Sequence, residues 1–381
     1  MKKLYWRSRA VSRTKVALVA MCALGGLALV EVVKVRKAQP YLKEKLAASR
    51  LARDAMEAVK AERVARHTPI DPETDPAQSG IVGLVISPIT TNTASLATKQ
   101  TSVNPNFAAV AVDLLRRAGV QDGDAVAVGC SGSFPALNIA TMAAIQTLGL
   151  KPAVISSVSS SQWGANDPGF VWLDMERLLH GKGMLSFRSV AASRGGIEDT
   201  AVGLSKQGKQ LLDEAIARNG IPALKPKNYA ESVNQRMALY AERSGGARIK
   251  AYINVGAGAA SVGSRIGRRL FKPGLNRTAP KGASAADSVM VRFVHDGVPV
   301  INLLHVEALA QTYGFPLQPA AVPVVGEGRA FVRQQYNRWL ALAVLVAIGT
   351  MLVLGLRSGL SIPLTGIAAP QKPSEPPEPI L

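Results

Sequence analysis

The stretch DAVAVGCSGSFPALNIATMAAIQTLGLKPAVISSV, residues 124–158, decides the fold. Its first part, DAVAVG, is a short apolar run that ends at a glycine, which is typical of a buried strand. PALNIATMAAIQTLG then predicts a helix, and PAVISSV predicts a second strand. Because a strand, a helix and a further strand in this order form a parallel unit, the stretch predicts an α/β fold.

The same alternation continues on both sides of this unit. GIVGLVIS (80–87) predicts a buried strand, and NPNFAAVAVDLLRRAG (104–119) predicts a helix capped by Asn104 or Asn106 and stopped by Gly119. Further strands are predicted at RIKAYINVG (248–256), DSVMVRFV (287–294) and VPVINLL (298–304), and a short helix at HVEALAQTYG (305–314). Residues 80–325 are therefore expected to form one doubly wound, mostly parallel α/β domain.

Two apolar segments flank this domain. VALVAMCALGGLALV (16–30) extends to about Val33, and LALAVLVAIGTMLVLGL (340–356) follows Trp339. Each is about long enough to cross a bilayer. Residues 1–15 carry six Lys/Arg and no acid, as in a secretory signal, but a convincing A-x-A cleavage site is missing. The sequence therefore predicts transmembrane helices at 16–33 and 339–356, enclosing the α/β domain.

The remaining segments connect these parts. Residues 34–79 contain a helix-favouring run at 41–66 followed by three prolines, which predicts a helical stalk and linker. Residues 1–15 are a basic N-terminal segment, 326–338 a linker and 357–381 a Pro-rich tail. Two spans place both termini on one side of the membrane. The basic residues before the first span favour termini inside and an extracytoplasmic α/β domain.

The loop Gly129-Cys130-Ser131-Gly132-Ser133 is open to three interpretations. It resembles a nucleophile elbow with Ser131 as the catalytic serine, although Ser133 stands where that motif has glycine. Histidines that would complete a triad lie downstream at His180, His295 and His305. Alternatively the loop binds an anion: Gly129 and Gly132 permit close approach, Ser131 and Ser133 donate hydrogen bonds, and the helix N-terminus favours negative charge. The third interpretation is a tight turn without a ligand.

Two further segments contain candidate ligand-binding residues. Trp163, Asn166 and Asp167 follow a predicted strand, where open α/β sheets bind ligands, but a plain turn at Asp167 explains this segment equally well. In the Gly-rich stretch at 254–269, Arg265 and Arg268 are candidates for holding a polyanion. A flexible surface loop with solvated charges is the alternative there. Asp174 and Glu176 are expected to be surface charges of a helix.

The chain carries a large excess of positive charge. It contains 45 Lys/Arg and 26 Asp/Glu, a net charge of +19. Such a protein attracts polyanions and anionic lipid headgroups in a salt-sensitive way. Nucleic acid is not an expected partner, because aromatic residues make up only 5% of the chain and a nucleic-acid motif is missing. Cys22 and Cys130 lack the spacing of a metal site, and neither a metal nor a cofactor is predicted.

Several stretches together resemble a known family. SPITT, TSVNPNFAAVAVDLLRRAG, VGCSGSFPALNIA, SSQWGANDPGFVWLDMERLL and AYINVGAGAASVG are similar to segments of the bacterial poly-gamma-glutamate system protein family. The resemblance covers about residues 80 to 265, and the two flanking apolar segments also fit. It implies an accessory component of poly-gamma-glutamate synthesis or export in the bacterial cytoplasmic membrane. Its partners would be other subunits of that machinery, the anionic polymer and membrane lipid.

The sequence also allows one alternative function. It is a membrane-bound, serine-dependent hydrolase or transferase that acts on gamma-glutamyl or related acyl bonds through Ser131.

Overall fold

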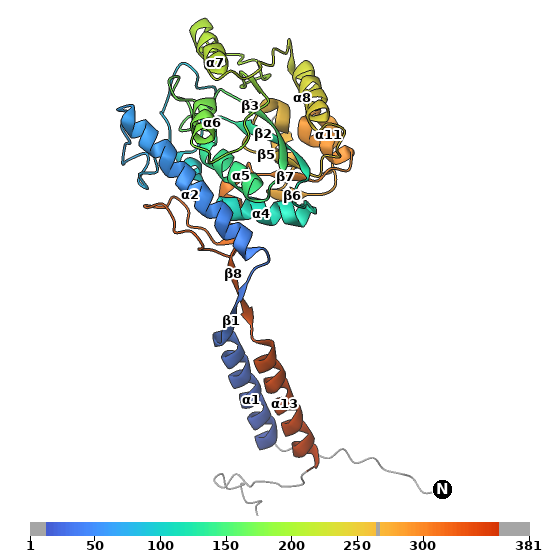
Figure 1. Cartoon of the computed structure of the whole chain (residues 1–381). Coiled ribbons are helices and arrows are strands. Elements are labelled where there is room, and N and C mark those ends of the chain that lie inside the picture. Colours follow the sequence, from blue (N-terminus) through green and yellow to red (C-terminus); the bar gives the residue numbers. More distant parts are fainter. Residues whose placement is uncertain (1–12, 264–266, 358–381) are drawn as a thin grey trace, which may run out of the picture. The chain divides into compact units, whose positions relative to one another are not determined.

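The computed structural model describes residues 13–263 and 267–357, which divide into two compact units. The smaller unit contains helices α1 (Arg13–Val32) and α13 (Arg338–Arg357), and the larger unit, Ala38–Arg333, contains the main sheet (Figure 1).

A six-stranded sheet forms the centre of the larger unit, with the strand order β4-β3-β2-β5-β7-β6. The strands are β2 (Ala125–Ser131), β3 (Lys151–Ser157), β4 (Ala191–Ser193), β5 (Tyr252–Asn254), β6 (Gly274–Asn276) and β7 (Val300–Asn302). Neighbouring strands are parallel except β6 and β7, which pair antiparallel. The predicted α/β fold with a mostly parallel sheet is confirmed.

Helices cover both faces of this sheet. Successive residues of a strand point to opposite faces, so each strand contributes side chains to two separate cores. Val126 and Val128 of β2 belong to one hydrophobic core, whereas Ala127 belongs to the other. The first core is completed by α4 (Phe107–Ala118), α5 (Pro135–Thr147) and α6 (Trp172–Gly181), and the second by α8 (Tyr229–Arg243) and α11 (Val289–His295) (Figure 1). The uninterrupted apolar run of β2 thus reflects burial on both faces.

The larger unit contains further helices. They are α3 (Leu96–Ser102), α7 (Lys206–Arg218), α9 (Ala259–Val262), α10 (Gly267–Leu270), α12 (Val306–Tyr313) and a 3-10 helix at Ala283–Ala285. The predicted bounds of α4 are confirmed. Gly119 ends it in the left-handed conformation, with φ 93°. Asn106 occupies the cap position, but its side chain instead bonds Val324 O and Gly326 N.

Two predicted strands are wrong. Residues 80–87 form an irregular segment whose backbone hydrogen-bonds to side chains instead of to a neighbouring strand. The Arg63 guanidinium donates to Val82 O, and the Asn166 side chain bonds both the N–H and the carbonyl oxygen of Leu84. The segment DSVMVRFV forms helix α11, because the Ser288 hydroxyl accepts from Val291 N–H and caps the helix start. Its β-branched residues suggested a strand, but tertiary burial of one helix face determines its structure.

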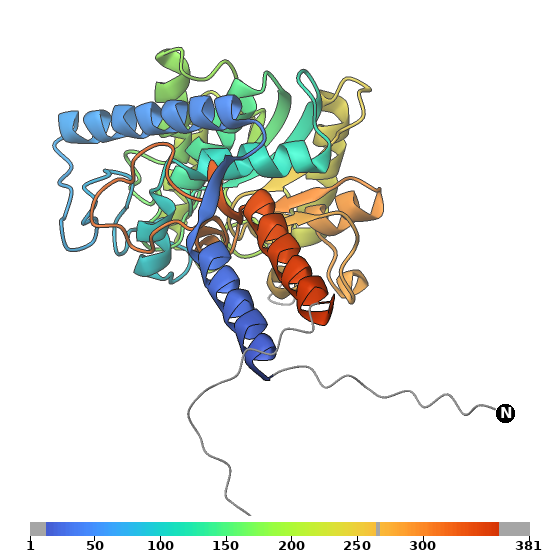
Figure 2. The ribbon, with the colours of Figure 1, turned by 90° about the horizontal axis from the view of Figure 1, so that it is seen from below.

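The predicted stalk is also wrong, although its helix is present. Helix α2 (Leu42–Ala65) belongs to the larger unit and lies along α4 and α5 (Figure 2). Ala48, Ala52 and Val59 are fully buried on its inner face. The Lys45 ammonium, 0% exposed, lies 2.7 Å from a carboxylate oxygen of Asp113 in α4. Small alanines allow close helix packing, so the helix that was expected to form a stalk instead has a core-facing surface.

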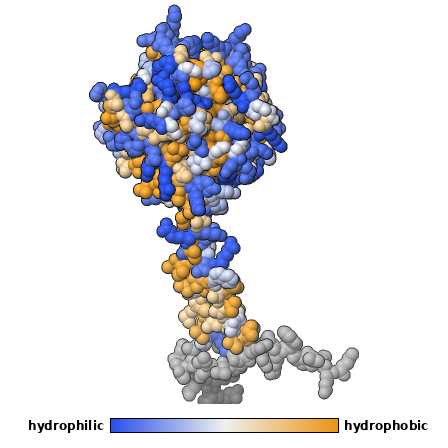
Figure 3. All heavy atoms as spheres, in the orientation of Figure 1, coloured by the Kyte–Doolittle hydropathy of each residue, from blue (hydrophilic) through white to orange (hydrophobic). Residues whose placement is uncertain are grey.

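In the smaller unit, α1 and α13 pack side by side. A Cβ atom added to Gly26 of α1 would lie 2.4 Å from Cγ1 of Val344 in α13, so this glycine permits the close approach of the two helices. Apolar side chains such as Leu24 and Leu345 remain exposed, and Figure 3 shows this apolar surface. The predicted linker 326–338 contains β8 (Val332–Tyr336), which pairs with β1 (Lys34–Ala38) in a two-stranded sheet.

Among the described residues, α1 is the one helix that is both long and apolar enough to cross a membrane. An apolar helix near an N-terminus is either a membrane span or a signal sequence. The apolar helical stretch Arg338–Leu354 is shorter, so length and composition do not support the second predicted span. Most of the basic segment 1–15 and of the Pro-rich tail 357–381 lies outside the described residues.

Candidate ligand-binding site

The carboxyl ends of β2 and β5 mark the point where the chain changes direction across the sheet. After β2 the chain adds β3 and then β4 on one side, whereas β5 and β7 lie on the other side of β2. Loops that diverge at such a point in an open parallel sheet leave a crevice in which ligands bind. The loops after β2, β3 and β5 are therefore the elements that position a site.

A cavity of about 50 Å³ lies between these loops. The loop after β2 contributes Ser131 and Ser133, and the end of β3 contributes Ser157 and Ser159. The remaining lining residues are Thr91, Asn92, Gly196, Ile197, Ala257, Gly258, Ala259 and Arg268. We call it the serine cavity. Whole-ligand pockets measure roughly 300–1,000 Å³, so this volume suits a single small group such as a carboxylate or phosphate.

A larger cavity of about 730 Å³ adjoins the serine cavity. The two cavities share four lining residues: Asn92, Ile197, Ala259 and Arg268. Tyr229, Glu198 and Asp287 line the larger cavity but not the smaller one. One ligand can thus place a small polar group among the serines and a longer body in the adjoining space.

The hydroxyl groups of Ser131 and Ser133 are oriented by the loop that carries them. Ser131 Oγ accepts from Ser133 N–H at 3.2 Å, and Ser133 Oγ accepts from Ser161 N–H at 3.0 Å. Each hydroxyl therefore keeps its own proton to donate to an anion. Within the described residues, none of the histidine, carboxylate or lysine side chains hydrogen-bonds to Ser131 Oγ, as a nucleophile elbow would require.

Ser159 has an unsatisfied hydroxyl group at the cavity wall. Its side chain is 3% exposed, and its Oγ has no hydrogen-bond partner among the described residues. A buried hydroxyl without a partner costs roughly 1–3 kcal/mol, so such groups usually bond to a ligand or to water. This residue therefore marks a position where an acceptor group is expected.

A buried ion pair fixes the wall behind Ser157. Arg236, 1% exposed, donates from Nη2 to Asp199 Oδ2 at 2.8 Å, to Ser193 Oγ at 2.7 Å and to Ser157 Oγ at 3.2 Å. Ser232 adds a hydrogen bond of 2.5 Å to Asp199 Oδ2. These hydrogen bonds hold Ser157 rigidly at the cavity.

The loop that carries Asp199 is strained. Glu198, Asp199 and Ala201 have positive φ angles of 55°, 61° and 59°, which residues other than glycine rarely adopt. Gly196 and Ile197 of the same loop line the serine cavity. Backbone strain persists only where surrounding contacts enforce it, and it concentrates at functional sites. Here the Arg236–Asp199 ion pair supplies that enforcement.

The glycines of the loop after β2 have a packing role. A Cβ atom at Gly129 would lie 2.3 Å from Tyr252 Oη, and one at Gly132 would lie 2.7 Å from Val158 O. The close approach predicted at these positions is therefore made by the protein's own atoms. Ser131 and Ser133 line the cavity, whereas Gly129 and Gly132 do not.

The structure does not bring Trp163, Asn166 and Asp167 into the serine cavity. The fully buried Asn166 amide bonds Leu84 N, Leu84 O and Thr90 Oγ1, so it holds an irregular segment in place. Asp167 accepts from Gly169 N–H at 2.9 Å, which is the turn that was the alternative interpretation.

Only one of the two candidate arginines belongs to the described residues. Arg265 lies outside the described residues, and Arg268 lines both cavities.

Asp174 and Glu176 are buried rather than exposed, which corrects the prediction that they are surface charges. Helix α7 and the segment before β4 cover this face of α6. Asp174 pairs with Arg218 of α7 at 2.5 Å and accepts from Val171 N–H at the start of α6. Glu176 Oε1 accepts from both the N–H and the O–H of Ser189. Burial raises the pKa of Glu176 to about 7.

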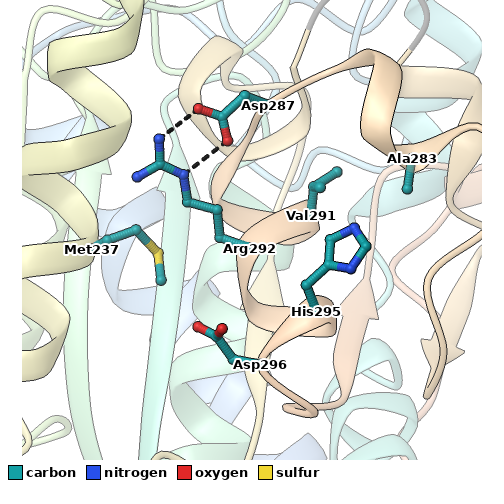
Figure 4. A pocket seen from close by; sticks show the side chains of 7 residues that line it. All are labelled: Met237, Ala283, Asp287, Val291, Arg292, His295 and Asp296. Carbon is teal, nitrogen blue, oxygen red and sulfur yellow. Dashed lines mark hydrogen bonds and ion pairs between the residues drawn. The ribbon is translucent and has the colours of Figure 1, made fainter.

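A separate cavity of about 480 Å³ lies where α8 and α11 meet. Arg292 and Asp287 face each other there and form two hydrogen bonds, of 2.8 and 2.5 Å (Figure 4). The Arg292 guanidinium lowers the pKa of the Asp287 carboxyl group. His295 lies at the end of α11 and lines this cavity. Because its charged pair is mutually neutralised, this cavity offers a weaker anion site than the serine cavity.

Comparisons of the chain with protein-family models, with curated proteins and with solved structures found no match. The site is therefore interpreted from its own geometry. Sequence reasoning missed Ser157 and Ser159, which directly follow the predicted strand PAVISSV and were detectable by their place at a strand end. It also missed Asp199 and Arg236, which reach the site from distant segments.

Proposed function

We propose that the larger unit binds the carboxylate or phosphate group of an anionic ligand in the serine cavity. The observation that carries this proposal is the buried hydroxyl of Ser159 at the cavity wall, which has no hydrogen-bond partner among the described residues. Ser131 and Ser133 supply further O–H donors, and the exposed Arg268 supplies positive charge at the junction of both cavities. Hydroxyl and guanidinium donors together suit an oxyanion.

The ligand that best fits the whole chain is a gamma-glutamyl polymer or its precursor. Such a polymer carries a carboxylate on every residue, and the net charge of +19 attracts it over a long range. The adjoining cavity of about 730 Å³ accommodates neighbouring units of the same chain. With the family resemblance, this supports an accessory component of poly-gamma-glutamate synthesis or export.

We also propose that both α1 and α13 span the bacterial cytoplasmic membrane, with the larger unit outside. The two helices lie side by side and expose apolar side chains, and Trp339, 80% exposed, stands at the start of α13 where interfacial aromatic residues are common. Alkaline extraction of membranes, together with reporter fusions at the C-terminus, tests this. Release of the chain by alkali, or a reporter active only outside, argues against it.

Calorimetric titration tests the proposed binding site. The full chain in detergent is titrated with short gamma-glutamyl oligomers, inorganic phosphate and a sugar phosphate. Ser159→Ala removes a hydroxyl that bonds no other described group, and we expect it to weaken binding by about 1.5–3 kcal/mol. Ser49→Ala is the matched control, because Ser49 Oγ is also buried and lacks a partner in the described part of the chain, but lies in α2. Equal binding by wild type and Ser159→Ala contradicts the proposal.

A further inference from the structure

Lys99 of α3 is a buried lysine next to the serine cavity. Its side chain is 3% exposed, its Nζ lies 2.9 Å from Ser161 Oγ, and it also bonds Ser133 O. The Phe134 ring lies beneath the nitrogen, with its centroid 4.2 Å away. These contacts fix the amine directly against the hydroxyl of Ser161.

In the described part of the chain, Lys99 has no carboxylate partner, which sets it apart from the other buried basic side chains. Lys45 pairs with Asp113, and Arg236 pairs with Asp199. A buried ammonium without a counter-charge is costly, and burial lowers the pKa of Lys99 to about 7. A substantial fraction of the amine is therefore neutral near neutral pH and has a lone pair to accept a proton.

Ser161 is placed so that a substrate can reach it. It is partly exposed, and its N–H donates to Ser133 Oγ, so it adjoins the wall of the serine cavity. A serine hydroxyl hydrogen-bonded to a neutral lysine is a known arrangement for activating a nucleophile. Ser131 has no equivalent base among the described residues.

We propose that Ser161 is a nucleophile and Lys99 its general base, and that the pair transfers acyl groups from esters or amides. The Ser161 hydroxyl proton moves to Lys99 Nζ while Oγ forms a bond to the carbonyl carbon. The bond from that carbon to the leaving group then breaks, and Lys99 returns the proton to the leaving group. Water cleaves the resulting acyl-serine ester by the same route and releases the acid.

Covalent labelling of the full chain in detergent tests this proposal. The probes are phenylmethanesulfonyl fluoride and p-nitrophenyl acetate, and peptide mass spectrometry locates the adduct. With the sulfonyl fluoride, the Ser161 oxygen bonds to sulfur and fluoride leaves with the proton. We expect the adduct on Ser161, and its loss in Ser161→Ala. Ser186→Ala is the control variant, because Ser186 is exposed and does not line the serine cavity, and it should be labelled like wild type.

Lys99→Arg separates a base from a structural cation. Arginine keeps positive charge and hydrogen-bond donors but does not accept a proton, so labelling should slow by about 100-fold or more. Should this variant fail to fold, Lys99→Met serves instead, with folding checked by circular dichroism. The proposal is overturned by an adduct on another residue, by labelling no faster than in heat-unfolded protein, or by a folded Lys99 variant labelled at the wild-type rate. Titration with gamma-glutamyl oligomers stays a separate test of the proposed binding function.

Discussion

Arg236 and Lys99 are two buried basic side chains at the same edge of the sheet, and they have opposite surroundings. Arg236 is 1% exposed and bonds the Asp199 carboxylate and two serine hydroxyls. Lys99 is 3% exposed and bonds a carbonyl and one hydroxyl. The Asp199 charge opposes the effect of burial and raises the pKa of Arg236, whereas burial alone lowers the pKa of Lys99 to about 7.

The difference separates a structural charge from a reactive one. A paired guanidinium stays charged and fixes the shape of its surroundings, as Arg236 does for Ser157 and the strained loop. An unpaired lysine changes its protonation near neutral pH and is suited to proton transfer. Mutations at and around both sites should therefore give different patterns of stability and pH dependence.

The largest expected effect follows from breaking the Arg236 pair. Asp199→Asn leaves a buried guanidinium without a counter-charge and should lower the free energy of unfolding by about 3–5 kcal/mol. Urea unfolding of the full chain in detergent measures it. A double variant, Asp199→Leu with Arg236→Met, should recover much of the loss because no unpaired charge remains. A loss below about 1 kcal/mol in Asp199→Asn would show that the pair is not a structural element.

Gly129 allows a test of close packing in a place where no ion pair is involved. A Cβ atom there would lie 2.3 Å from Tyr252 Oη and disturb the 2.7 Å hydrogen bond between Tyr252 and Ser261. Gly129→Ala should lower the free energy of unfolding by about 1–3 kcal/mol. Gly181→Ala in α6 is the control, since nothing lies within 4 Å of its added Cβ, and it should be neutral or stabilising. Equal stability of the two variants would contradict the packing role.

Lys99→Met should be neutral or stabilising, with the gain larger at pH 6 than at pH 9. The folded pKa of about 7 lies below the unfolded value of about 10.4, so the cost of burying this lysine grows as pH falls from about 10.4 to about 7 and is fully present below 7. Methionine removes this cost. Urea unfolding at both pH values measures the effect. A loss of stability at pH 6 would indicate that the ammonium is a needed structural group.

Glu176 provides the opposite pH dependence and the smallest expected effect. Its folded pKa, about 7, lies above the unfolded value of about 4.3, so its contribution is fully present below pH 4.3 and is lost as pH rises through 7. Glu176→Gln should therefore flatten the fall in unfolding free energy between pH 5 and pH 8. Unfolding curves of wild type and variant across this range provide the measurement, and identical slopes would contradict the assignment.

Local sequence pattern predicted the elements that local chemistry determines. The β2-α5-β3 unit was found because its apolar runs, Pro135 and Gly149 lie next to one another in the chain, and the same unit identified Ser131 and Ser133. Helix α11 was missed because its valines favour strands, although the Ser288 cap signal was present. The burial of α2 was missed because a helix-favouring composition does not reveal what covers the helix.

The rest of the site depends on tertiary contacts that leave no local pattern. Asp199 and Arg236 are 37 residues apart, and Lys99 and Ser161 are 62 residues apart. Lysine in a short polar helix is normally exposed. Only the packed structure shows that Lys99 is covered and lacks an acidic partner among the described residues.

The central claim, that the serine cavity binds an anion, is tested most directly by calorimetric titration of gamma-glutamyl oligomers into wild type, Arg268→Gln and Arg269→Gln. The two arginines are neighbours in α10 and both are exposed, but only Arg268 lines the two cavities. We predict binding by wild type, a loss of at least about tenfold in affinity for Arg268→Gln, and near wild-type affinity for Arg269→Gln. Equal affinities for the two variants, or no binding by wild type, would contradict the claim.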